Sequence, residues 1–140
     1  IPTEQAQRTA QYEDNIDIEQ KVRILIAEDD DTSKMYLQEL LETDKADLIF
    51  AKNGTEVLDR FQHEAIDMIL MDIKMPVMNG LDATRHIREM DPHIPIIAQT
   101  AYASGSSRQE ALKAGCTDFI SKPIESNKLK RMIRQYIKKR

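Results

Sequence analysis

The sequence predicts an α/β domain built around a single sheet of parallel β-strands. Short apolar runs alternate along the chain with stretches of helical spacing, and several of these runs stop at polar residues. The clearest run covers residues 66–71 and ends in Asp72, before a loop that contains Pro76 and Gly80. An apolar run that ends in a carboxylate and a Pro/Gly loop is typical of a buried parallel strand that delivers its last side chain to the edge of a sheet.

Length and composition are consistent with one ordinary domain preceded by a polar leader. A chain of 140 residues can bury roughly two-thirds of the surface of its unfolded state. Hydrophobic residues make up 41% of the chain and aromatic residues only 5%, which suits a core of aliphatic side chains and Met. Residues 1–20 are polar, Gln-rich and acidic, so we expect a linker or a poorly ordered terminus there and a folded domain over 21–140.

Two strand–helix units occupy the first half of the expected domain. The apolar runs 22–27 and 46–51 predict strands. Asp31 or Thr32 can cap the helix after the first strand, and a second helix is expected over 55–64. The apolar positions that we expect on the inner sides of these helices are Met35, Leu37, Leu40, Leu41, Val57, Leu58 and Phe61.

Three further units complete the pattern. Strands are expected over 66–72, 94–100 and 117–121, and helices over 81–90, from a cap at Ser104 or Ser106 to 114, and over 125–138. The inner helix positions are expected to be Leu81, Thr84, Ile87, Ala111, Leu112, Ala114, Leu129, Met132, Ile133, Tyr136 and Ile137. Five βα units with short connections imply a parallel five-stranded sheet with helices on both faces, the flavodoxin-like doubly wound arrangement with strand order 2-1-3-4-5.

Polar side chains follow four of the five expected strands. In chain order these are Glu28-Asp29-Asp30, Asp72, Gln99-Thr100 and Lys122-Pro123. In an open α/β sheet, ligands bind outside the carboxyl ends of the strands, so these side chains should meet at one edge. At an effective dielectric constant of about 20, Glu28, Asp29 and Asp72 would repel one another by a few kcal/mol per pair. A bound cation would offset this repulsion. A set of oxygen ligands favours Mg²⁺ or Mn²⁺ over zinc.

Such an edge can support phosphoryl chemistry. With a metal in place, Asp72 can act as a nucleophile and form an aspartyl phosphate. The Lys122 ammonium and the Thr100 hydroxyl can then stabilise the charge on the transferred group. Before phosphorylation, Lys122 can serve as the counter-ion of Asp72.

These residues together resemble the receiver domain of two-component response regulators, and most of all the receivers attached to hybrid sensor histidine kinases. The resemblance covers about residues 22–138 and rests on Glu28-Asp29, Leu70-Met71-Asp72-Ile73-Lys74-Met75-Pro76 with Asn79-Gly80, Thr100-Ala101 and Lys122-Pro123. It implies a phosphoacceptor signalling domain, not an enzyme with a separate substrate. The domain would take a phosphoryl group from a histidine kinase or a histidine phosphotransfer protein, with Mg²⁺ as cofactor and Mn²⁺ as a substitute.

The resemblance also implies a metal site. Asp72 would be the phosphoacceptor and, with Asp29, a direct metal ligand. The backbone carbonyl of Lys74 would complete the protein ligands, and Glu28 would act through a metal-bound water. Asp30 would face away from the ion.

A switch is implied as well. Thr100 and Lys122 would contact the phosphoryl group, and Thr100 and Phe119 would pass on the change. Because Phe119 has no hydroxyl group, its movement would be a change of packing. The bond between Lys122 and Pro123 resembles the cis peptide of the family, which would fix the direction of the lysine.

Two positions bear on the lifetime of the phosphoryl group. Lys74, two residues after Asp72, and Tyr102, two residues after Thr100, would flank the path of the hydrolytic water. A long cation and a bulky ring at these positions predict slow self-dephosphorylation.

Two other functions compete with a receiver. A dehalogenase-like phosphatase would also form an aspartyl phosphate, but it needs a second acid two residues after the nucleophile, where this chain has Lys74. A docking module that binds partners without phosphorylation would not require the complete set of acids, hydroxyl and lysine.

Charge and cysteine content limit the partners and the compartment. A net charge of −4 and a pI near 5.4 argue against direct binding to nucleic acid or to an anionic membrane. The single cysteine, Cys116, excludes an internal disulfide and fits a cytoplasmic location, free or as the cytoplasmic part of a membrane-bound kinase. The chain begins with Ile1-Pro2, so we expect a receiver excised from a hybrid sensor kinase. We expect a monomer or a weak, phosphorylation-linked dimer.

Overall fold

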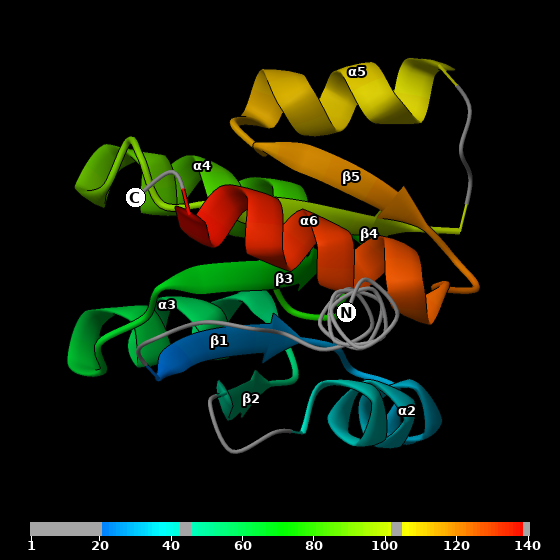
Figure 1. The fold of residues 1–140 in the computed structure, drawn as a ribbon. Helices are drawn as coiled ribbons and strands as arrows, with labels where there is room; N and C mark the ends of the chain where they lie inside the picture. Colours follow the sequence, from blue (N-terminus) through cyan, green and yellow to red (C-terminus); the bar gives the residue numbers. More distant parts are fainter. Residues whose placement is uncertain (1–20, 43–45, 102–104, 139–140) are drawn as a thin grey trace, which may run out of the picture.

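The structure, a computed structural model, describes residues 21–42, 46–101 and 105–138, so the leader, Tyr102 and Ser104 lie outside the described residues. Strands and helices alternate in the order β1 (Val22–Ala27), α2 (Asp31–Leu41), β2 (Ala46–Ala51), α3 (Gly54–His63), β3 (Met68–Asp72), α4 (Gly80–Met90), β4 (Ile96–Thr100), α5 (Gly105–Ala114), β5 (Asp118–Ser121) and α6 (Ser126–Lys138). All neighbouring strands pair in parallel in the order β2-β1-β3-β4-β5, which confirms the predicted doubly wound topology (Figure 1).

Helices cover both faces of the sheet, with α2 and α6 on one side and α3, α4 and α5 on the other (Figure 1). Successive side chains of β1 alternate between the two cores. Ile24 and Ile26 pack with the α2 and α6 side, whereas Leu25 and Ala27 pack with the α3, α4 and α5 side. Because both faces are buried, the central strands are continuous apolar runs without polar alternation.

Three strands begin later in the chain than the apolar runs predicted. β3 begins at Met68 instead of 66, β4 at Ile96 instead of 94, and β5 at Asp118 instead of 117. For β4 the reason is Pro95, which has no backbone N–H to donate to a sheet ladder. Helices α3, α4 and α6 begin within one residue of the predicted positions.

The cap of α2 differs from the prediction. Asp30 caps this helix, not Asp31 or Thr32, and its carboxylate accepts a hydrogen bond from the backbone N–H of Ser33 at 2.8 Å. A carboxylate at this position satisfies a backbone donor that the first helical turn leaves without a partner.

Two apolar residues that were predicted to face the core are exposed. The exposed fraction is 62% for Met35 on α2 and 44% for Leu112 on α5. In each helix the core is contacted by other positions, Leu37 and Leu41 in α2 and Ala111 in α5. At about 100° of rotation per residue, Met35 points away from the side of α2 that carries Leu37 and Leu41.

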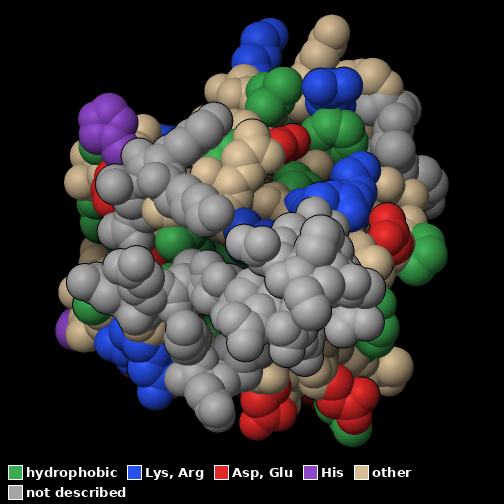
Figure 2. Space-filling view, in the orientation of Figure 1, with side chains coloured by type: hydrophobic (Ala, Val, Ile, Leu, Met, Phe, Trp, Pro, Cys, Tyr) green, Lys and Arg blue, Asp and Glu red, His purple; other side chains and the backbone are tan. Residues whose placement is uncertain are grey.

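The described surface carries charges of both signs. Figure 2 shows acidic and basic side chains spread over the face that carries α2 and α6. No helix in the described ranges is long and apolar enough to cross a membrane.

Gly80 fixes the start of α4 against the end of β3. Its backbone N–H donates to the carbonyl of Ile73 at 2.9 Å, and the preceding Asn79 caps the helix. A Cβ atom at Gly80 would overlap the carbonyl oxygen of Asp72 and lie 2.9 Å from Cγ of Met71. The close approach of helix and strand therefore requires glycine at this position.

We expect Gly80→Ala to lower the free energy of unfolding by about 3 kcal/mol, because the added methyl group overlaps backbone atoms that cannot move independently. Urea unfolding measures the change. The matched control is Gly105→Ala at the start of α5, where a Cβ would meet nothing within 4 Å. That control should gain roughly 0.5 kcal/mol from the lower entropy of the unfolded chain. Equal stability of the two variants would contradict the packing argument.

Candidate functional site

The carboxyl ends of β1, β3, β4 and β5 meet around a cavity of about 300 Å³. The cavity is lined by Glu28 and Asp29 after β1, Asp72 at the end of β3, Thr100 at the end of β4 and Lys122 after β5. Short strands in parallel register bring these residues together although nearly a hundred positions separate the first from the last. The edge of the sheet therefore gathers the acids, the hydroxyl and the cation that the sequence placed at strand ends.

Three carboxylates form a cluster in this cavity. Glu28, Asp29 and Asp72 each offer one oxygen, and these oxygens lie within 4.8 Å of one another. Glu28 and Asp72 are buried, with exposed fractions of 3% and 5%, whereas Asp29 is exposed. Hard oxygen ligands at this separation, carrying excess negative charge, suit a divalent cation such as Mg²⁺.

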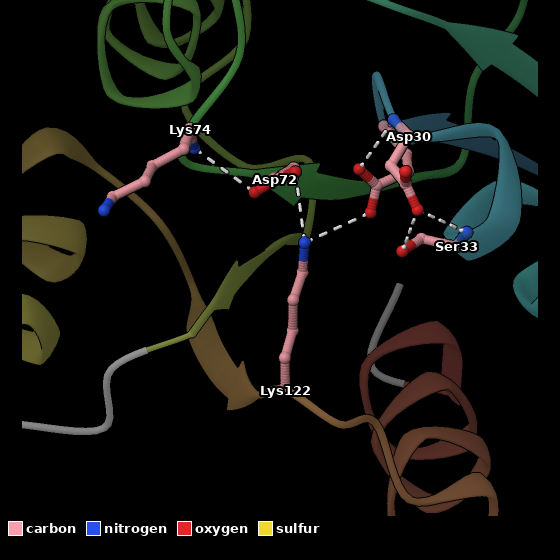
Figure 3. Close-up of polar contacts among 6 residues, drawn as sticks. Asp30, Ser33, Asp72, Lys74 and Lys122 are labelled. Carbon is pink, nitrogen blue, oxygen red and sulfur yellow. Dashed lines mark hydrogen bonds and ion pairs between the residues drawn. The ribbon is translucent and has the colours of Figure 1, made fainter.

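Lys122 bridges two of these acids. Its Nζ donates to Oδ2 of Asp72 at 3.1 Å and to Oε1 of Glu28 at 3.2 Å, and Figure 3 shows the side chain extended toward both strands. Burial alone would lower the pKa of Lys122, but the carboxylates of Asp72 and Glu28 raise it above its ordinary value. The ammonium group is therefore charged at neutral pH.

Glu28 is held in an environment that disfavours its charged form. Burial, together with the adjacent Asp72 carboxyl group, raises the pKa of Glu28 from 4.5 to about 7, although the Asp30 N–H and Lys122 act in the opposite direction. The backbone N–H of Asp30 donates to Oε2 of Glu28 at 3.2 Å and orients the carboxyl group.

Asp30 belongs to the helix cap and not to the acidic cluster. Its carboxylate accepts from both the backbone N–H and Oγ of Ser33, at 2.8 and 2.9 Å (Figure 3). These hydrogen bonds from Ser33 lower the pKa of Asp30. Its side chain is thus engaged with α2.

The other predicted site residues surround Asp72 and Lys122. The backbone N–H of Lys74 donates to Oδ1 of Asp72 at 3.2 Å, and the Lys74 side chain is exposed at the cavity (Figure 3). Thr100 is buried, and its carbonyl accepts from the backbone N–H of Lys122 at 2.7 Å. The peptide bond between Lys122 and Pro123 is cis.

Phe119 lies outside the cavity, on the neighbouring strand. Its ring is half-buried against the core on the α3, α4 and α5 side. The guanidinium group of Arg108 on α5 lies 4.9 Å from the ring centroid, a cation–π contact. Phe119 therefore joins β5 to α5.

Gln99, Ser107 and Glu110 line the cavity although the sequence-based prediction gave them no role. Gln99 lines the cavity beside Thr100 and is fully buried. The only signal for Gln99 in the sequence is an amide near the end of an otherwise apolar strand.

Comparison with known proteins gives concordant matches. The family model for the response regulator receiver domain matches residues 24–134. Hybrid signal transduction histidine kinase I from Dictyostelium discoideum is 39% identical over 125 residues, which is 82% of this chain but only 7% of that kinase. The polar-differentiation response regulator DivK from Brucella anthropi is 34% identical over 116 residues, which is 81% of this chain and 94% of DivK.

A similar solved structure is the receiver domain of a sensor histidine kinase from Pseudomonas aeruginosa PAO1, described with a magnesium ion coordinated in the active site cleft. It is 30% identical, with a TM-score of 0.78, and the match covers 84% of this chain and 98% of that one.

The raised pKa of Glu28 predicts that stability falls with pH when no divalent metal is present. Below pH 4.5 the carboxyl group is protonated in both states, and between 4.5 and about 7 only the folded chain retains the proton. The free energy of unfolding should therefore decrease as the pH rises through this interval.

In a chelating buffer at about pH 8, Glu28→Gln should be more stable than the wild type by on the order of 2 kcal/mol, and the difference should vanish near about pH 4. Urea unfolding across the pH range measures it, with Asp31→Asn, an exposed acid on α2, as the matched control. A difference that does not change with pH would show that the carboxyl charge is not its cause.

Proposed function

Because this chain belongs to the response regulator receiver family, we propose that Asp72 accepts a phosphoryl group from a phosphohistidine donor. The observation that carries the proposal is a buried carboxylate at the end of β3 that lies 3.1 Å from the Lys122 ammonium and within the cluster formed with Glu28 and Asp29. Receiver domains have a phosphoacceptor role in two-component systems, and they are not classical enzymes.

Mg²⁺ fits the donor set, and Mn²⁺ has the same preference for oxygen. Asp29 and Asp72 would hold the ion directly, together with the backbone carbonyl of Lys74, and Glu28 would act through a bound water. The fit rests on three carboxylate oxygens within 4.8 Å of one another, with one lysine paired to two of the acids. When bound, the ion supplies positive charge beside the phosphoryl oxygens.

The chain's own residues would carry the transfer. A carboxylate oxygen of Asp72 attacks phosphorus, and the bond from phosphorus to the donor imidazole nitrogen breaks as the new P–O bond forms. Lys122 moves from its carboxylate partners toward the phosphoryl oxygens, and the hydroxyl of Thr100 donates a hydrogen bond to them. The product is an aspartyl phosphate.

Phosphorylation would then change the surface formed by α5, β5 and α6. Thr100 would turn toward the phosphoryl group and Phe119 would follow by repacking. The cation–π contact between Arg108 and Phe119 supports this route, because it links β5 to α5.

The biological setting is also a proposal. The similarity to kinase-attached receivers supports a receiver segment of a hybrid sensor histidine kinase. Its donor would be a histidine kinase or a histidine phosphotransfer protein in the cytoplasm. The domain would be a monomer or a weak phosphorylation-linked dimer, with no nucleic acid or membrane contact of its own.

Incubation with acetyl phosphate and Mg²⁺ should add one phosphoryl group, measured by intact mass, since Asp72 and its stabilising groups are already assembled. The adduct should be acid-stable, base-labile and absent without Mg²⁺. Asp72→Asn should abolish it, while Asp82→Asn, an acid on the neighbouring α4, serves as the matched control and should retain it. An adduct of equal yield on Asp72→Asn would rule out Asp72 as the acceptor.

Slow loss of the phosphoryl group is expected from Lys74 and Tyr102. Lys74→Asn and Tyr102→Glu should each speed decay, by roughly two- to tenfold, because each variant loses a side chain that we expect to shield the phosphoryl group from water, a long cation in one case and a bulky ring in the other. Decay of the adduct after removal of acetyl phosphate measures the rate. Lys74→Arg, which retains a long cation, should decay like the wild type, and unchanged decay in the first two variants would refute the shielding idea.

A further inference from the structure

Gln99 carries a polar amide on a buried face of the sheet where the core side chains are apolar. It lies in β4, paired in register with Asp72, and two positions after Ile97, whose side chain packs in the core on the α2 and α6 side. Its exposed fraction is 0%. Neither Oε1 nor Nε2 has a hydrogen-bond partner among the described residues. A buried amide without hydrogen bonds lowers the stability of the fold. Because buried polar groups are normally hydrogen-bonded to protein or to ordered water, we expect a partner for this amide.

The amide stands between two hollows. The first is the cavity of about 300 Å³ around Asp72, and the second is a groove of about 420 Å³ between α2 and the loop after β5. Three residues line both: Glu28, Gln99 and Lys122. The Gln99 side chain is therefore placed beside the cation and one of the acids of the site.

The second hollow, the groove between α2 and the loop after β5, has both apolar and polar walls. Apolar walls come from Leu37 and Ile124, and the hydroxyl of Tyr36 donates to the carbonyl of Ile124 at 2.7 Å. This bond ties α2 to the loop that carries Lys122. The hollow is larger than the roughly 30 Å³ share of one water in the liquid, and it has several polar groups on its wall.

The two acids engage only two of the N–H donors of the Lys122 ammonium group. An ammonium group has three N–H donors. Two of them go to Asp72 and Glu28, at 3.1 and 3.2 Å. Those two acids are the hydrogen-bond partners found for the ammonium group among the described residues, and Gln99 Oε1 is an acceptor that lines the same two hollows.

We propose that Gln99 is a positioning residue for Lys122, and that an ordered water in the second hollow links its amide to the third ammonium proton. The proposal rests on the phosphoacceptor function of Asp72. The link gives the lysine a restraint besides its two acid partners, so that its ammonium stays aimed at the phosphoryl group when it leaves Glu28. The same water then donates to Oε1 of the buried amide and gives that oxygen a partner.

The test compares Gln99→Met, an apolar replacement of similar length, with Ile97→Val on the same face of β4. Rates of phosphorylation by acetyl phosphate with Mg²⁺ are measured for both, with urea unfolding as a check of folding. Gln99→Met should fold at least as stably as the wild type and react about three- to tenfold more slowly. Ile97→Val should be less stable and react at the wild-type rate. Gln99→Leu serves in the same way if Met is not accommodated.

A double-mutant cycle tests whether Gln99 affects the phosphorylation rate through Lys122. In a Lys122→Ala background, Gln99→Met should have no further effect on the rate, because its target is absent. An unchanged rate in the single variant, or an equal loss in both backgrounds, would overturn the proposal and leave Gln99 with a role in packing only.

A measurement without phosphorylation separates this proposal from the function on which it rests. In ¹⁵N NMR of the unphosphorylated protein, the ammonium signal of Lys122 should be protected from exchange with water and lose that protection in Gln99→Met. Equal exchange in both proteins would overturn the positioning role even if Asp72 is phosphorylated. Protection that depends on Gln99 in a chain that acquires no phosphoryl group would instead refute the proposed function alone.

Discussion

The ammonium group of Lys122 lies within 3.2 Å of carboxylate oxygens from two different strand ends, and a third acid completes the cluster. At an effective dielectric constant of about 20, the attraction between the ammonium group and each of these two carboxylates is roughly 5 kcal/mol before the cost of desolvation. The repulsion among the acids is of similar size. One lysine does not balance three carboxylates. The site therefore carries excess negative charge, and the rest of the fold holds the acids together against their repulsion. This excess charge favours a divalent cation, and the cation in turn favours an incoming phosphoryl group.

The fold holds the cluster by burying the strands that carry it. β1 and β3 are covered on both faces, and their last residues cannot separate without exposing both cores. Local contacts then set the direction of Glu28 and Asp72. The Asp30 N–H orients Glu28, the Lys74 N–H contacts Asp72, and Gly80 brings α4 against the end of β3. These two acids are thus held by backbone groups, whereas Lys122 reaches them on a flexible side chain and is the part that would move during the proposed transfer.

Much of this arrangement follows from the sequence, because parallel strands bury both faces and end at one edge. The strand order and the meeting of Glu28, Asp29, Asp72, Thr100 and Lys122 could be predicted on that basis. Apolar content alone placed Met35 and Leu112 in the core, where neither lies. For Met35, helical spacing already argues against that place, because about 100° of rotation per residue turns it away from Leu37 and Leu41. Apolar content could not choose Asp30 over its neighbours as the cap either. The place of Gln99 between two hollows required the packed structure, because strand alternation gives the face but not the shape of the space above it.

The most direct test of the account is transfer from a phosphohistidine phosphotransfer protein, followed by borohydride reduction and peptide mass spectrometry. Reduction converts an aspartyl phosphate to homoserine and so marks the acceptor residue permanently. The account predicts a single modified peptide, with the change at Asp72, formed only when Mg²⁺ is present. A mark on Asp29 or Glu28, or a donor that keeps its phosphoryl group although Mg²⁺ binds to the acidic cluster, would contradict it.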